Sequence, residues 1–234
     1  MNDRLLACPA AMATLQASGV NCVERHPGTA TFDLHRVAPA DLFAQSVRLA
    51  TEVHLYQMRK VSGHSYVSHA LLAAGMTVQA GGTVRAACIA VLHDVIEEGG
   101  AEALRELQHR FPASIVDAVQ AMTPNPEKKN MPYEQRKKIN IEHMRSAAQE
   151  DTDVAMAYAA EKCATLWELK QDFSLLGPDQ VMKSLRRSGH QIMWYYQQVE
   201  NVLTRYVSGP MANTLTLHVN MVRERLEVQG TFEH

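Results

Sequence analysis

A chain of 234 residues is long enough for one domain of ordinary size with an extension, since domains usually span roughly 100 to 200 residues. Its content of 46% hydrophobic and 21% charged residues is that of a folded, water-soluble protein and excludes the disordered, collagen-like and low-complexity classes. The 23 basic and 25 acidic residues give a net charge of −2, which argues against a dedicated nucleic-acid-binding protein but allows a local basic pocket.

Apolar residues recur with the helical period along almost the whole chain, and alternating strand patterns are nearly absent. In chain order, the expected helices span residues 39–58, 66–76, 83–96, 101–111, 113–122, 133–148, 154–170 and 179–206. Gly or Pro separates most of them. The third is apolar enough to lie in the middle of a bundle. The pattern therefore predicts an all-α fold, with weaker signals at both ends of the chain.

The cysteines and the amino terminus indicate a cytoplasmic protein. Cys8, Cys22, Cys88 and Cys163 show no CxxC spacing, so we expect reduced, structural thiols. The amino-terminal segment lacks the apolar core of a signal peptide, and no apolar stretch reaches the roughly 18 residues of a membrane span. We therefore expect a cytoplasmic location and no membrane partner.

His93 and Asp94 close the apolar run CIAVLHD, where two ionisable side chains are unfavourable unless a metal or a partner compensates them. On a continuous helix, Glu97 and Glu98 would lie one turn further on, on the faces of His93 and Asp94. The helix end would then offer two metal ligands and two carboxylates able to hold or deprotonate a water. His69, on a neighbouring predicted helix, would add a second imidazole. The alternative for a His-Asp dipeptide alone is a surface cap.

These motifs resemble those of the metal-dependent HD hydrolases that degrade the alarmone (p)ppGpp, namely the hydrolase domain of RelA/SpoT proteins and the small alarmone hydrolases. The family has H-x-G-Q-x-R-K, then Y-x-x-H-P, then HD followed by V-E-D; here HLYQMRKVSGHSYVSH begins at His54 and HDVIEEG begins at His93. The matching residues are Gln57, Arg59, Lys60, Gly63, Tyr66, His69, His93, Asp94 and Glu97. The departures are Tyr56 for Gly, Ala70 for Pro, Glu98 for Asp and one inserted residue after Lys60. The resemblance spans roughly residues 45–169 and includes the basic helix YEQRKKINIEH.

The resemblance implies an all-α HD-type helical bundle over residues 45–206, with an N-terminal extension over 1–44 and a C-terminal helical tail over 207–234. It also implies one divalent metal, Mn²⁺, held by His69, His93, Asp94 and a fourth carboxylate. In the family, that fourth ligand is an Asp in a K-x-A-D-R-x-x-N-L helix.

The segment YAAEKCATL, which begins at Tyr158, places Glu161 at the position of that Asp and Thr165 at the position of the Asn. A Glu can ligate Mn²⁺ through oxygen, but its extra methylene requires the helix or the metal to shift by about a bond length. Two alternatives stay open. Glu161 could form a structural salt bridge, or a rival register could place Thr165 at the Asp position and leave three protein ligands.

The resemblance further implies hydrolysis of the 3′-pyrophosphate of (p)ppGpp to GDP or GTP and pyrophosphate, so that the partner is a guanosine polyphosphate and not a nucleic acid. Glu97 and Glu98 would orient or deprotonate the water. The expected substrate-binding residues are Arg59, Lys60, Arg136 and Thr165. Two other functions remain open: an HD phosphohydrolase for another nucleotide, and a non-catalytic sensor or interaction protein on an HD scaffold. Both a monomer and a homo-oligomer are compatible with the sequence.

Overall fold

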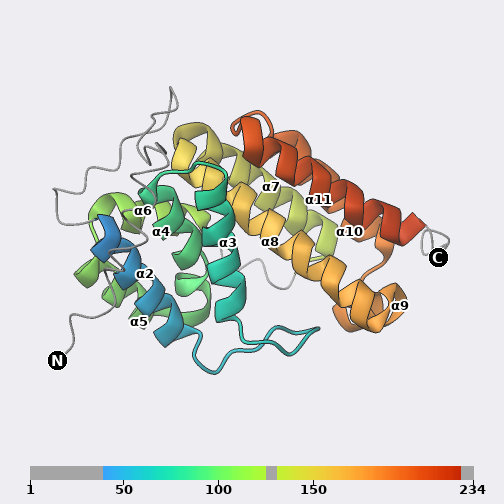
Figure 1. Cartoon of the computed structure of the whole chain (residues 1–234), viewed down its shortest axis with the longest axis horizontal. Helices are drawn as coiled ribbons and strands as arrows, with labels where there is room; N and C mark the ends of the chain where they lie inside the picture. The colour runs from blue at the N-terminus through green and yellow to red at the C-terminus, as the bar shows by residue number, and fades with distance from the viewer. Residues whose placement is uncertain (1–38, 125–130, 228–234) are drawn as a thin grey trace, which may run out of the picture. The chain divides into compact units, whose positions relative to one another are not determined.

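Ten helices, α2 to α11, form the regular structure of residues 39–124 and 131–227, which are the residues that the computed structural model describes (Figure 1). They are α2 (Pro39–Val53), α3 (Val67–Gln79), α4 (Val84–Leu92), α5 (Val95–Arg110), α6 (Ala113–Met122), α7 (Tyr133–Glu150), α8 (Thr152–Leu176), α9 (Pro178–Leu185), α10 (Gly189–Leu203) and α11 (Gly209–Glu227). Strand pairing in the described ranges is limited to an isolated bridge between Met58 and Ser65. The predicted all-α fold is confirmed.

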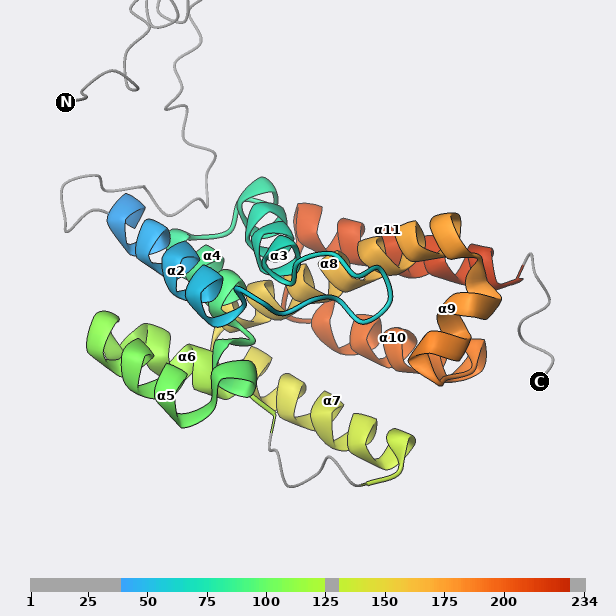
Figure 2. The same cartoon turned by 90° about the horizontal axis from the view of Figure 1, so that it is seen from below.

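Helix α8 runs through the middle of the bundle and packs against α3, α4, α7 and α11 (Figures 1 and 2). Its buried side chains lie on several faces, as expected for a central helix. Asp151 caps its start, because its carboxylate accepts hydrogen bonds from the N–H groups of Asp153 and Val154 at 2.9 and 3.3 Å. The helix ends at Leu176 and is followed by Gly177, which has a φ of 79°. The other helices are thus positioned around a single long support.

Helix α4 is buried on two sides, as its nearly all-apolar sequence predicts. Ile89 and Ala90 belong to the core around α8, whereas Val91 and Leu92 belong to a second core formed with α2, α5 and α6. Cys88 and Cys163 are buried free thiols, and the other two cysteines lie outside the described residues. Because α4 links both cores, its carboxyl end is held firmly where the His-Asp pair follows.

The predicted continuous helix over residues 83–96 is wrong. Helix α4 ends at Leu92 and α5 begins at Val95, so His93 and Asp94 form the junction between two helices. Glu97 and Glu98 lie in the first turn of α5, which begins after Asp94, and the Glu98 N–H donates to the Asp94 carbonyl at 3.0 Å. The expected break at Gly99 and Gly100 is present as a kink within α5, because Gly100 has a non-helical φ of 62°.

The predicted helix over residues 179–206 is also wrong, because it is two helices. Arg186 adopts a left-handed conformation with a φ of 54° after α9. Ser188 then begins α10 with a capping box, in which its hydroxyl accepts from the N–H of Gln191 and the Gln191 side chain accepts from the N–H of Ser188. Other helices also end away from the predicted residues, among them α2 at Val53, α3 at Gln79 and α8 at Leu176.

The segment between α2 and α3, drawn below α3 in Figure 1, is tied by backbone hydrogen bonds. The Arg59 N–H donates to the His64 carbonyl at 2.7 Å, and the Gly63 N–H donates to the Arg59 carbonyl at 2.9 Å. Gly63 has a φ of +69°, which a residue with a side chain rarely adopts. The turn therefore fixes the backbone of Arg59 and of Lys60 beside it.

Helix α11 is built into the main core. Its buried residues recur every three or four positions and lie in the same cluster as those of α8 and α10: Met211, Leu215, Val219, Val222 and Leu226. The predicted boundaries at residues 44 and 206 stay predictions, and most of the N-terminal extension lies outside the described ranges. In the described part of the chain, none of the helices has both the length and the apolar character to cross a bilayer.

Candidate metal centre and adjoining cavities

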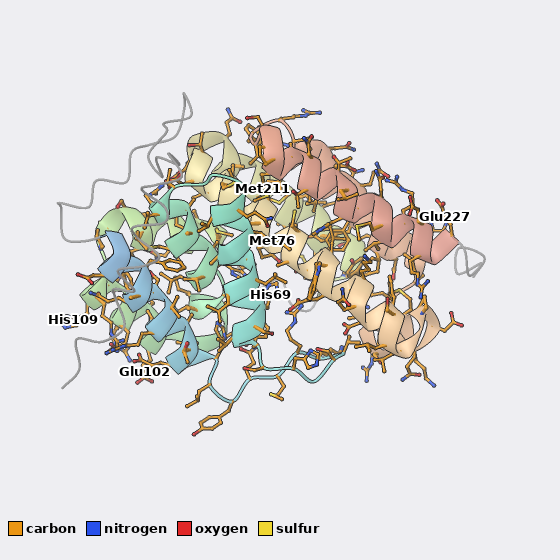
Figure 3. The ribbon with its side chains drawn as sticks, viewed as in Figure 1. His69, Met76, Glu102, His109, Met211 and Glu227 are labelled. Carbon is orange, nitrogen blue, oxygen red and sulfur yellow. The ribbon has the colours of Figure 1, made fainter. Side chains whose placement is uncertain are left out.

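Three predicted ligands meet in space. Donor atoms of His69, His93 and Glu161 all lie within 4.8 Å of one another. His69 comes from α3, on the side next to α8 in Figure 3, His93 from the junction after α4, and Glu161 from α8. The two histidines are only 1% and 5% exposed. Two imidazoles and one carboxylate suit a first-row divalent metal ion.

Each imidazole has its Nδ1 engaged, which leaves its Nε2 for a metal. The Nδ1 of His93 lies 2.8 Å from the Ala90 carbonyl oxygen, and the Nδ1 of His69 lies 3.0 Å from Oε2 of Glu168. Both oxygens accept, so we infer that each Nδ1 carries the proton. The Nε2 of His93 is buried and forms no hydrogen bond with another described residue, which fits a metal ligand.

Asp94 lies outside this group of three. Its Oδ2 accepts a hydrogen bond from the Tyr66 hydroxyl and lies 3.0 Å from the Nε2 of His93, although the angles there do not make a hydrogen bond. Burial would raise the pKa of Asp94, but the neighbouring His93 and Tyr66 hold it well below its usual range. An anionic oxygen of Asp94 thus lies beside the Nε2 of the candidate ligand His93. The role of Asp94 as the fourth ligand stays a prediction.

Glu161 is held by two neighbours on α8. It forms an ion pair with Lys162, and Thr165 Oγ1 donates a hydrogen bond to its Oε1 at 3.1 Å. Burial would raise the pKa of Glu161, but the Lys162 ammonium lowers it. A salt bridge therefore exists, yet the same carboxylate reaches the two histidines. This arrangement supports Glu161 over Thr165 as the residue at the ligand position.

Glu168 is a residue of this centre that the sequence motifs did not indicate. It accepts from Nδ1 of His69 and pairs with Nη2 of Arg59 at 2.7 Å. The Arg59 guanidinium also lies 5.1 Å from the centre of the Tyr66 ring, so its position is set from two sides. The sequence could have indicated Glu168, because it follows Glu161 by seven residues and the two therefore lie on one face of α8. Glu168 thus orients a predicted ligand and restrains a predicted substrate-binding residue.

We expect Glu168→Ala to weaken Mn²⁺ binding about 10- to 100-fold, because the His69 imidazole would lose the acceptor that fixes its orientation. Isothermal titration calorimetry with Mn²⁺ measures this directly. Glu142→Ala is the matched control, since Glu142 is an exposed helical Glu that pairs with Arg145 on α7. Equal affinities for both variants would contradict the orienting role of Glu168.

A cavity of about 680 Å³ opens beside the candidate ligands. His93, Asp94 and Glu161 line it, and so does the exposed Glu97 of α5. Glu98 is exposed and is not among the lining residues. The structure therefore separates the two carboxylates predicted to act on water: Glu97 borders the cavity of the metal centre, and Glu98 does not.

A second cavity of about 430 Å³ adjoins the first, because Arg136, Lys137 and Tyr195 line both. The other three predicted substrate-binding residues, Arg59, Lys60 and Thr165, line the second cavity. Lys137 and Tyr195, to which the sequence motifs assigned no role, also lie where the two cavities meet. The Nζ of Lys137 lies 4.0 Å from the centre of the ring of Tyr195, which is buried. The junction thus carries cations suited to phosphate groups.

Comparison with known proteins agrees with this fold. The family model for the HD domain matches residues 46–187. A solved structure of a metazoan ortholog of SpoT, described as hydrolysing ppGpp and playing a role in starvation responses, superposes with a TM-score of 0.60 at 19% identity, covering 81% of this chain and 96% of that one. The crystal structure of lmo0812 from Listeria monocytogenes EGD-e has a TM-score of 0.56 at 22% identity, covering 68% and 99%. No curated protein matches the sequence.

Proposed function

The chain belongs to the HD domain family, and from this membership we propose a metal-dependent phosphohydrolase that removes the 3′-pyrophosphate of (p)ppGpp, with Mn²⁺ as the metal. The family and the structural likeness support the phosphohydrolase class. The observation that carries the proposal is the cluster of His69, His93 and Glu161, which lies beside the first cavity. That cavity shares lining residues with the second cavity, which basic side chains line. A site of this form suits a ligand with both a phosphate arm and a heterocycle.

When bound, the metal would supply a Lewis acid and lower the pKa of a water molecule. His69, His93 and Glu161 would hold it, with Asp94 as the proposed fourth ligand. The remaining roles fall to other residues of the chain. Glu97 would accept a proton from the water, because it borders the same cavity.

Phosphate binding is proposed for the cations at the cavity junction. Arg136 and Lys137 line both cavities and would neutralise the charge that develops on the departing pyrophosphate. Lys60 and Arg59 line the second cavity, where the guanidinium of Arg59 is already held by Glu168. The proposed cytoplasmic location and the oligomeric state stay predictions.

We expect the Mn²⁺-loaded protein to release pyrophosphate from guanosine 3′,5′-bis(diphosphate), with GDP as the second product. Phosphorus NMR follows both products, and the chelator-treated protein is the control without metal. Turnover confined to a different nucleotide in the same panel would reassign the substrate. If the protein bound Mn²⁺ but cleaved no nucleotide, the chain would be a non-catalytic HD protein.

A further inference from the structure

Asp172 is a buried carboxylate that lines the second cavity. It lies on α8, is only 8% exposed and lines the cavity. Among residues 39–124 and 131–227, no other side chain or backbone group makes a hydrogen bond or an ion pair with it. Burial raises the pKa of Asp172, and the nearby Glu168 adds to this effect. The carboxylate oxygens are not fully buried, so the donors of a ligand in the cavity can reach them.

Neither a second metal ion nor a structural ion pair accounts for this carboxylate. A second metal ion would need further ligands, but the described residues contain no group of three His, Cys, Asp or Glu ligands that includes Asp172. A structural ion pair would need a cation, but the nearby Arg59 pairs with Glu168 instead, and the exposed His64 forms no ion pair with Asp172 among the described residues. The Asp172 carboxylate lines the cavity and can accept hydrogen bonds from neutral N–H groups of a ligand.

The walls around Asp172 suit a flat heterocycle. Aromatic and aliphatic side chains line the second cavity: Tyr66, Tyr133, Tyr196, Leu169, Leu185 and Ile192. Such walls pack against a ring face, and a few polar groups fix the ring's orientation. A carboxylate can only accept hydrogen bonds. Guanine offers two adjacent donors, the N1–H and the 2-amino group, whereas adenine offers one donor beside an acceptor. The carboxylate thus matches guanine best among the common bases.

The position of Asp172 along α8 agrees with this match. Asp172 follows Glu161 by eleven residues, which is about 16 Å and close to three full turns, so both lie on one face of the helix. Arg136 and Lys137 line both cavities between these ends. A nucleotide with its base at Asp172 would therefore extend its phosphates past the cations toward the metal centre.

We propose that Asp172 determines base specificity by accepting hydrogen bonds from the N1–H and the 2-amino group of guanine. This inference rests on the proposed function, since it names the group that would select the guanosine part of the substrate. Asp172 takes no part in the chemical step.

The test is calorimetric binding of three nucleoside 5′-diphosphates: GDP, IDP, which lacks the 2-amino group, and XDP, which has a 2-oxo group in its place. We expect the unaltered protein to bind GDP about 10- to 100-fold more tightly than IDP, the usual worth of a bidentate base contact. In Asp172→Asn this preference should disappear and XDP binding should improve, because the amide offers one donor and one acceptor. Asp179→Asn, an exposed Asp on α9, is the matched control and should keep the GDP preference.

Several results would overturn the assignment. Equal affinity of the unaltered protein for GDP and IDP would do so without any variant, as would the absence of binding by all three nucleotides. In Asp172→Asn, a retained GDP preference, or a loss without any gain for XDP, would show that the residue does not read the base. Binding needs no turnover, so a GDP preference lost in Asp172→Asn, together with no cleavage of guanosine 3′,5′-bis(diphosphate), would refute the proposed function and keep the role of Asp172.

Discussion

Glu161→Gln is expected to weaken Mn²⁺ binding by more than the roughly 100-fold upper value for loss of a group that only orients a ligand. The change replaces an anionic oxygen next to two imidazoles by a neutral amide, while the side chain keeps its length. Glu161→Asp should retain the metal, because the resemblance places an Asp at this position. Titration of Mn²⁺ into both variants measures the effect. Activity should fall with metal occupancy.

The same titration distinguishes the two registers of α8. If Thr165 occupied the ligand position, Thr165→Asp would tighten binding and Glu161→Gln would leave it unchanged. Glu150→Gln, an exposed Glu at the end of α7, controls for loss of one negative charge. An unaltered Mn²⁺ affinity in Glu161→Gln would remove this residue from the metal centre.

Glu97→Gln is expected to lower kcat about 10²- to 10⁴-fold with little change in Mn²⁺ affinity, because the amide cannot accept the proton of the water. Glu97 borders the cavity of the candidate ligands without belonging to their cluster. Steady-state kinetics at saturating substrate, combined with metal titration, separates the two effects. Glu102→Gln, at an exposed site on the same helix that is labelled in Figure 3, is the control.

Glu98→Gln tests which of the two neighbouring carboxylates acts on the water. The resemblance implies a role for both, but Glu98 does not line the cavity. If Glu98→Gln lowered kcat as strongly as Glu97→Gln, the proton would move through a pair of carboxylates. Loss of metal in Glu97→Gln would instead identify Glu97 as a ligand.

Helical periodicity and short motifs carried most of what the sequence could predict. The nearly all-apolar α4 was expected at the middle of the bundle and is buried against both cores. His69, His93 and Glu161 were expected to meet and do so. Each of these inferences depends on side-chain type and on spacing within one helix, which are local properties.

Features set by contacts between distant segments were not predicted. Helix α4 ends at Leu92 and α5 begins at Val95, although no Gly or Pro marks this break. The contact between Glu168 and Arg59 joins residues more than 100 positions apart. The break before Ser188 differs, because Ser188 and Gln191 carried a local capping signal that the apolar periodicity outweighed.

One uninterrupted helix, α8, contains Glu161, Thr165, Glu168 and Asp172, and this limits how the gene can vary. One residue inserted between Glu161 and Asp172 would rotate everything after it by about 100° and shift it by about 1.5 Å. Asp172 would then turn away from its cavity, and an insertion before Glu168 would also turn Glu168 away from His69. A surface loop tolerates an added residue at little cost. Substitutions can therefore accumulate along this stretch of α8, but insertions and deletions cannot.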